Sequence, residues 1–154
     1  VDTGAHPMAG FDGELVTEGL EGLRARLKEY AELGARFAKW RAVITISEGT
    51  PTQSSIDANC HALARYAALC QEASIVPIVE PEVLMVGDHD IDTAYDVSEQ
   101  TLKSLFQHLY EQDVLLEGTI LKASMVLPGD KCRSEERRVG KECRGGCVAE
   151  KRNK

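Results

Sequence analysis

The sequence lacks an apolar run of the length that spans a bilayer, and its first residues lack the charged-then-apolar pattern of a secretion signal. It also lacks regular cysteine spacing. The cysteines are five, an odd number: Cys60, Cys70, Cys132, Cys143 and Cys147. The disulfide frameworks of secreted proteins usually use an even number of cysteines. We therefore expect reduced thiols, a cytoplasmic location and no membrane partner.

Basic residues are scarce over most of the chain. Residues 1–132 carry 10 Lys and Arg against 21 Asp and Glu, a formal balance of −11, whereas residues 133–154 carry 8 against 4, a balance of +4. A body this acidic is a poor general binder of nucleic acid or of anionic membranes, so we expect neither as a partner. The compositional break predicts a boundary between a domain at 1–132 and a charged tail at 133–154.

Three segments of the domain place apolar residues at helical spacing: residues 17–34, the segment that follows Pro51, and the segment that opens near Asp96. Thr17 is expected to cap the start of the first helix, and Gly34 is expected to end it. The pair Asp96 and Glu99 is expected to cap the start of the third helix. The expected buried faces are Ile56, Cys60, Leu63, Ala67 and Cys70 in the second helix, and Leu102, Leu105, Phe106 and Leu109 in the third.

Short runs rich in β-branched residues at 37–46, 75–84 and 114–126 predict three strands between and after these helices. Alternating helices and strands are typical of a parallel sheet covered by helices, an α/β fold. A doubly wound sheet usually carries a glycine-rich phosphate turn, which is missing here, so a (β/α)8 TIM barrel is favoured. Since a complete barrel takes about 250 residues, we expect only its middle part, incomplete at both ends.

Each predicted strand carries charge where a buried parallel strand is normally apolar. The residues are Lys39 and Arg41, then Glu80 and Glu82, then Lys122, each placed towards the expected C-terminal end of its strand. Ordinary ion pairs or exposed edge positions are one explanation. Burying a charge costs several kcal/mol, however, and three strands make the same exception. Side chains two apart share a face, so we expect all five to converge at the C-terminal mouth of a barrel, where barrel enzymes carry out chemistry.

The chemistry of these five residues is coherent. A lysine amine attacks a ketone only when desolvation or a neighbouring cation favours its neutral form. Lys122 lies between apolar residues and is expected near Lys39, while Glu80 can carry the proton transfers and Glu82 can pair with Lys39. Trp40 lies between two of the charged positions, so it is expected to point the other way and pack against the helices.

Three segments carry a resemblance to a known family: GLEGLRARLKEYAELGARFAKWR, LARYAALCQEASIVPIVEPEVL followed by GDHD, and LEGTILKASMVLPG. Together they resemble consecutive blocks of the class I fructose-bisphosphate aldolases, from Val1 to about Gly129. The resemblance implies reversible Schiff-base cleavage of fructose 1,6-bisphosphate into dihydroxyacetone phosphate and glyceraldehyde 3-phosphate, in glycolysis and gluconeogenesis. It also implies a phosphorylated sugar as substrate, a homo-oligomeric parent, and no metal or other cofactor.

The resemblance also implies a role for each charged residue. Lys122 matches the lysine that forms the Schiff base, Glu80 the general acid and base, and Lys39 the lysine beside the reacting hydroxyl groups. Glu82 matches the carboxylate partner of that lysine, and Arg41 matches a substrate-binding arginine. Two alternatives remain open: a noncatalytic scaffold with an aldolase fold, and another Schiff-base barrel enzyme such as a transaldolase, against which AKWR and VEPE argue.

Some features depart from the family pattern. Ala123-Ser124 stands where the family usually has Pro-Asn, and the family's lysine before Val-Asp falls before Val1, so we expect the fragment alone to be inactive. From Arg133 the pattern stops, and residues 133–144 resemble the translation of a sequencing adapter. A genuine disordered tail is the alternative. Metal binding is not expected at Cys143 and Cys147, nor at Asp88-His89-Asp90.

Overall fold

A computed structural model describes residues 1–132, and the predictions for the 133–154 tail lie outside the described part. The elements, in chain order, are β1 (Gly4–Pro7), β2 (Leu15–Glu18), α1 (Leu23–Glu32), β3 (Phe37–Ile44), α2 (Gln53–Glu72), β4 (Val76–Val83), α3 (Ile91–Glu111), the 3-10 helix η1 (Leu116–Gly118) and β5 (Ile120–Leu121). Strands β3, β4 and β5 form a parallel sheet in that order, and β1 and β2 form an antiparallel hairpin. The predicted α/β class is confirmed, whereas no closed barrel is present within residues 1–132.

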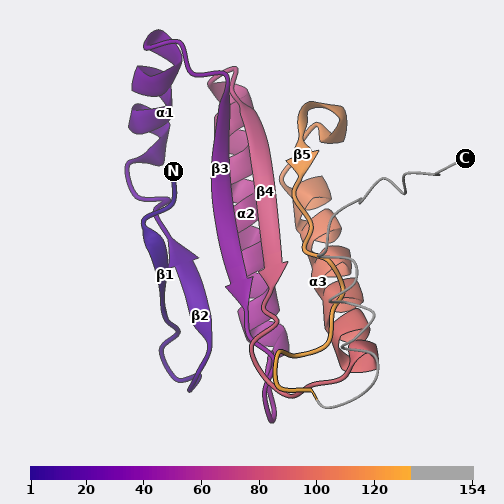
Figure 1. The fold of residues 1–154 in the computed structure, drawn as a ribbon. Helices are drawn as coiled ribbons and strands as arrows, with labels where there is room; N and C mark the ends of the chain where they lie inside the picture. Colours follow the sequence, from indigo (N-terminus) through magenta and orange to yellow (C-terminus); the bar gives the residue numbers. More distant parts are fainter. Residues whose placement is uncertain (133–154) are drawn as a thin grey trace, which may run out of the picture.

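Helix α2 forms as its apolar pattern predicts. All five residues of its predicted stripe are buried, and the side chain of Thr52 accepts a hydrogen bond from the Ser55 amide as the N-cap. Figure 1 shows α2 behind β3 and β4, so these two strands keep one face on the helix and leave the other uncovered. The core therefore lies between α2 and the sheet. No helix within 1–132 is long and apolar enough to cross a membrane.

The predicted starts of the other two helices are wrong. Thr17 is no cap, because it lies in β2, and α1 begins only at Leu23 after Gly22, whose φ is 65°. Helix α3 begins at Ile91, five residues before the predicted cap, because the Asp90 side chain accepts from the Thr93 amide. Its predicted buried face is partly right: Leu105 and Leu109 are buried, Leu102 is partly exposed, and Phe106 is 44% exposed.

The third predicted strand is much shorter than its apolar run. Only Ile120–Leu121 pairs with β4, and Leu116–Gly118 forms a 3-10 turn instead. The Lys122 amide still donates to the Val79 carbonyl at 2.9 Å, so the chain follows β4 a little further. The 3-10 turn uses the Leu115 and Leu116 carbonyls for its own hydrogen bonds, so pairing with β4 begins only after it. Helix α3 lies beside β4 and β5 on their α2 side (Figure 1).

Candidate active site

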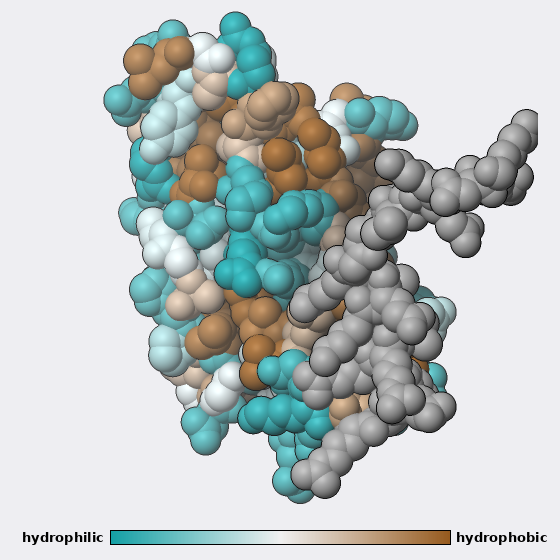
Figure 2. Space-filling view, in the orientation of Figure 1, coloured by the Kyte–Doolittle hydropathy of each residue, from teal (hydrophilic) through white to brown (hydrophobic). Residues whose placement is uncertain are grey.

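Strands β3 and β4 place their charged side chains on the face that α2 leaves open. Buried Trp40 points the other way and packs against Tyr66 of α2, with ring centroids 5.4 Å apart, as predicted. Alternation puts Lys39 and Arg41 on the opposite face. Figure 2, drawn from that side, shows hydrophilic surface across the middle with hydrophobic surface above and below it. The charges are therefore embedded in an otherwise apolar sheet face.

The predicted placement at the C-terminal ends of the strands is wrong for Lys39, Arg41 and Glu80. Lys39 is the third and Arg41 the fifth residue of the eight in β3, and Glu80 is the fifth of the eight in β4. Glu82, the seventh residue of β4, does lie near the end of its strand. The register pairs Arg41 with Glu80 and Lys39 with Ile78. The charged cluster therefore lies along the middle of the sheet. The stagger of the two strands determines which of its residues lie side by side.

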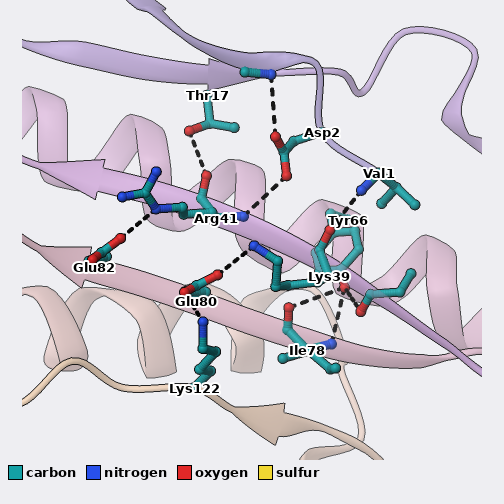
Figure 3. A network of polar contacts seen from close by, with 12 residues as sticks. Val1, Asp2, Thr17, Lys39, Arg41, Tyr66, Ile78, Glu80, Glu82 and Lys122 are labelled. Carbon is teal, nitrogen blue, oxygen red and sulfur yellow. Dashed lines mark hydrogen bonds and ion pairs between the residues drawn. The ribbon is translucent and has the colours of Figure 1, made fainter.

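Glu80 joins three strands. Its Oε2 accepts a hydrogen bond from Lys39 Nζ at 2.7 Å, and its Oε1 accepts one from Lys122 Nζ (Figure 3). The Glu80 side chain is 7% exposed, whereas those of Lys39 and Lys122 are 46% and 58% exposed. Three of the five predicted residues thus form one continuous chain of contacts, with the carboxylate on the central strand.

Arg41 and Glu82 form a second ion pair beside the first, through Arg41 Nε and a Glu82 carboxylate oxygen. The prediction that Glu82 pairs with Lys39 is therefore wrong. Lys39 lies opposite Ile78, four residues from Glu82, which is about 13 Å along a strand. Arg41, two residues further along β3, is within reach.

The electrostatics of Glu80 combine opposing causes. Burial by itself raises the pKa of the Glu80 carboxyl, but the hydrogen bonds from Lys122 and Lys39, with their charges, lower it below its usual range. The net effect is that the resting site holds Glu80 as an ionised carboxylate between two lysines. The Arg41 guanidinium similarly has a raised pKa, chiefly through its hydrogen bond to Glu82.

The expected apolar surroundings of Lys122 are not formed by residues 1–132. The flanking Ile120 and Leu121 are 45% and 39% exposed, and Met125 is 61% exposed. The reason is that β5 is an edge strand, with β4 on one side only. Lys122 instead has an anion, Glu80, as its nearest charged neighbour.

Several residues that support the cluster were not predicted. The Thr17 hydroxyl donates to the Arg41 carbonyl at 2.8 Å, and the Asp2 carboxylate accepts from the Arg41 amide at 3.3 Å. The hydroxyl of Tyr66 bonds the backbone of both β3 and β4. A sequence signal existed only for Tyr66, since a buried tyrosine at helical spacing needs a partner for its hydroxyl.

No group of three or more His, Cys, Asp or Glu side chains in residues 1–132 is arranged to hold a metal ion. In the Asp88-His89-Asp90 segment, Asp90 serves as the N-cap of α3. The charged groups that β3, β4 and Lys122 bring together on one sheet face are two amines, a guanidinium and two carboxylates.

Residues 1–143 match the family model Glycolytic, described as fructose-bisphosphate aldolase class-I. The chain belongs to this family. The match runs past residue 132, so the predicted domain boundary there stays a prediction. The family prediction, made from the AKWR, VEPE and LEGTILK blocks, is confirmed.

Relatives in the aldolase family are similar over most of the chain. A probable fructose-bisphosphate aldolase class 1 of Xylella fastidiosa (strain Temecula1 / ATCC 700964) is 69% identical over 135 residues, which cover 88% of this chain and 40% of the relative. The cytoplasmic isozyme 2 of fructose-bisphosphate aldolase from Pisum sativum is 51% identical over 129 residues, covering 84% of this chain and 36% of the relative. The chain thus spans about 40% of the length of the curated relatives it matches.

A solved structure shares the arrangement of elements. Fructose-bisphosphate aldolase from Plasmodium falciparum, in a ternary complex with TRAP and a small molecule inhibitor, is similar with a TM-score of 0.86 at 46% identity. The similarity covers 88% of this chain and 40% of that one. The α/β arrangement of residues 1–132 is therefore that of a segment of an aldolase.

Proposed function

We propose that this chain supplies central strands of a (β/α)8 barrel that cleaves fructose 1,6-bisphosphate reversibly into dihydroxyacetone phosphate and glyceraldehyde 3-phosphate. The single observation that carries the proposal is the Lys39–Glu80–Lys122 chain of contacts on an open sheet face. Membership of the class I aldolase family supports it. The remaining strands of the barrel would cover the open face and the free edges of β3 and β5.

Lys122 is the proposed nucleophile. Transfer of the hydrogen-bonded proton from Lys122 Nζ to Glu80 Oε1 leaves a neutral amine and a carboxylic acid. The amine attacks the ketone carbon, and one of its protons passes to the ketone oxygen to give a carbinolamine. The Glu80 acid then returns its proton to the carbinolamine hydroxyl, which leaves as water. The product is an iminium bonded to Lys122.

Carbon–carbon cleavage then uses the iminium as the electron acceptor. The Glu80 carboxylate removes the proton of the C4 hydroxyl, the C3–C4 bond breaks, and its electron pair passes into the iminium to give an enamine. Glyceraldehyde 3-phosphate leaves first. Protonation of the enamine carbon and hydrolysis of the iminium release dihydroxyacetone phosphate and restore Lys122.

Lys39, Arg41 and Glu82 act on the substrate without forming the covalent bond. The Lys39 ammonium, 2.7 Å from Glu80 Oε2, stabilises negative charge at the carboxylate and at the reacting hydroxyl groups. Arg41 is proposed to bind substrate, and Glu82, its ion-pair partner, fixes the direction of the guanidinium. A phosphorylated sugar substrate, a homo-oligomeric parent and a cytoplasmic location belong to the same proposal.

The test needs a complete barrel. In one such protein, which we call the grafted chain, only the part of this sequence that matches the Xylella relative replaces the corresponding 135 residues there. Borohydride added with dihydroxyacetone phosphate should reduce the imine to a stable secondary amine on the peptide that contains Lys122. Lys122→Met should abolish both adduct and cleavage.

Lys103 provides the matched control. It is an exposed lysine on α3, paired with Glu99 at 3.1 Å and far along the chain from the cluster. Lys103→Met should leave the adduct and the cleavage rate as they were, and chelators should do the same. An adduct mapped to another lysine, or a folded grafted chain that binds the sugar without forming any imine, would contradict the proposal.

A further inference from the structure

We propose that Tyr66 is a positioning residue for the Lys39–Glu80–Lys122 cluster, acting from the opposite side of the sheet through the backbones of β3 and β4. This inference rests on the proposed function, because it concerns the geometry of that same site. It comes from the unusual place of one hydroxyl group, which contacts neither lysine nor Glu80 and which α2 inserts between the two strands.

The surroundings of Tyr66 hold its side chain in one place. The residue has no exposed surface, and its ring packs against Trp40 at a centroid distance of 5.4 Å and an interplanar angle of 30°. Its hydroxyl donates to the Ala38 carbonyl at 2.5 Å and accepts from the Ile78 amide at 3.1 Å. The Ile78 carbonyl is 3.2 Å away (Figure 3). A ring wedged against an indole and bonded at its tip has little freedom to move.

The hydroxyl lies at a defined rung of the β3–β4 ladder. The Val76 amide donates to the Arg36 carbonyl, and the Leu84 amide donates to the Ile44 carbonyl. Bonds in a parallel ladder repeat every two residues on each strand, so the same series sets the Ile78 amide against the Ala38 carbonyl. These are the two groups that the Tyr66 hydroxyl bonds. The Tyr66 hydroxyl of α2 therefore contacts both strands at one rung of the ladder.

This rung adjoins the catalytic cluster on both strands. Lys39 follows Ala38 directly, and Glu80 lies two residues after Ile78. The Lys39 Nζ–Glu80 Oε2 contact of 2.7 Å crosses from β3 to β4 just beyond this rung, on the other face of the sheet. Any change in the spacing or stagger of the strands at this rung is passed to that contact, and through Glu80 to Lys122.

The Tyr66 hydroxyl keeps its proton. Burial raises the pKa of the Tyr66 hydroxyl well above its usual range, so the group stays a neutral donor and acceptor through the pH range of the enzyme. Removing the oxygen would take from the Ile78 amide an acceptor and from the Ala38 carbonyl a donor. The two strands would then lose a hydrogen-bonded link through α2 at this rung.

Tyr66→Phe in the grafted chain tests the inference, because it removes one oxygen and keeps the ring. A displacement of about 1 Å at a reacting group can cost on the order of 10²-fold in rate. We expect kcat to fall by about 10- to 100-fold with KM for fructose 1,6-bisphosphate little changed. The acid limb of the kcat profile should move to higher pH, because a looser contact with the lysines lets the pKa of Glu80 rise.

A variant that only weakens the core separates positioning from stability. Leu105→Val shortens a fully buried residue of α3 in the same core, and should lower Tm while leaving the acid limb in place. If Tyr66→Phe lowers Tm but leaves kcat and the acid limb unchanged, Tyr66 is structural only and the inference is overturned. If the unmodified grafted chain forms no imine, the proposed function itself has failed.

A measurement on unmodified protein covers the case in which Tyr66→Phe does not fold. A crystal structure of the grafted chain should place the hydroxyl within hydrogen-bonding distance of both the Ala38 carbonyl and the Ile78 amide. A structure in which the hydroxyl lies out of hydrogen-bonding reach of either group would overturn the inference without any variant.

Discussion

Lys39 of β3 and Lys122, which directly follows β5, reach opposite oxygens of the same carboxylate. Strand β4 separates β3 from β5, and its Glu80 accepts from Lys39 at one oxygen and from Lys122 at the other. The carboxylate is nearly buried, while both ammonium groups are about half exposed. One anion thus holds two cations together on the sheet face, and its removal would leave them facing each other.

Glu80→Gln in the grafted chain tests that role. The amide keeps the size of the side chain but can neither carry the charge nor take up the proton, so turnover should slow by roughly 10²- to 10⁴-fold, the usual range for losing a general acid–base. Steady-state cleavage of fructose 1,6-bisphosphate measures the effect. Glu48→Gln, at an exposed position outside every helix and strand, is the control and should change little. Comparable slowing by both variants would rule out a specific role for Glu80.

The pKa of Glu80 predicts how stability depends on pH. The folded protein holds this pKa below the usual value of 4.5, so near that pH the unfolded chain binds the proton first. The stabilisation by Glu80 is therefore fully present above about pH 4.5 and is lost as pH falls through the lower folded pKa. Measured as Tm against pH, the grafted chain should be steeper in acid than its Glu80→Gln variant. Parallel curves would contradict the assigned pKa direction.

Ser124 supports the end of β4. Its Oγ accepts a hydrogen bond from the Val83 amide at 3.2 Å, next to Glu82. Ser124→Ala leaves that partly buried amide without this partner, which should lower the free energy of unfolding of the grafted chain by about 1 kcal/mol. Urea denaturation measures it. Ser54→Ala, at an exposed position of α2, should be neutral or slightly stabilising, since alanine is the better helix former. Equal effects of the two changes would argue against the Ser124 contact.

The sequence predicted α2, β3 and β4 best. Apolar residues at helical spacing identified α2, and runs rich in β-branched residues identified β3 and β4. The β1–β2 hairpin was missed because each strand has four residues, too few to show alternation, and Thr17 was interpreted as a helix cap instead. The extent of β5 was wrong because a 3-10 turn takes up part of the apolar run and only two residues pair with β4, which no local pattern records.

The site shows the same division between local and long-range information. Alternation correctly put Lys39 and Arg41 on one face, and Glu80 and Glu82 likewise. The pairing between them depends on register, which joins residues about 40 apart in the sequence. The stagger of β3 against β4 therefore decides that Glu82 binds Arg41. The role of the Tyr66 hydroxyl was equally hidden, because its partners are backbone groups of two distant strands.

The last prediction concerns Lys39, which assists the chemistry without forming the covalent bond. Its ammonium shares Glu80 with Lys122, and 46% of its side chain is exposed towards the open face where substrate would bind. Lys39→Met keeps the length and apolar stem of the side chain but removes the charge. Cleavage by the grafted chain should fall sharply, because negative charge on the reacting hydroxyl loses its nearest cation. Borohydride should still trap some imine with dihydroxyacetone phosphate, since Lys122 and Glu80 remain in contact.

The control is Lys28→Met, the same change on an exposed lysine of α1, which should affect neither measurement. Complete loss of the adduct in Lys39→Met would move the covalent step to Lys39, and undiminished cleavage would remove Lys39 from the mechanism.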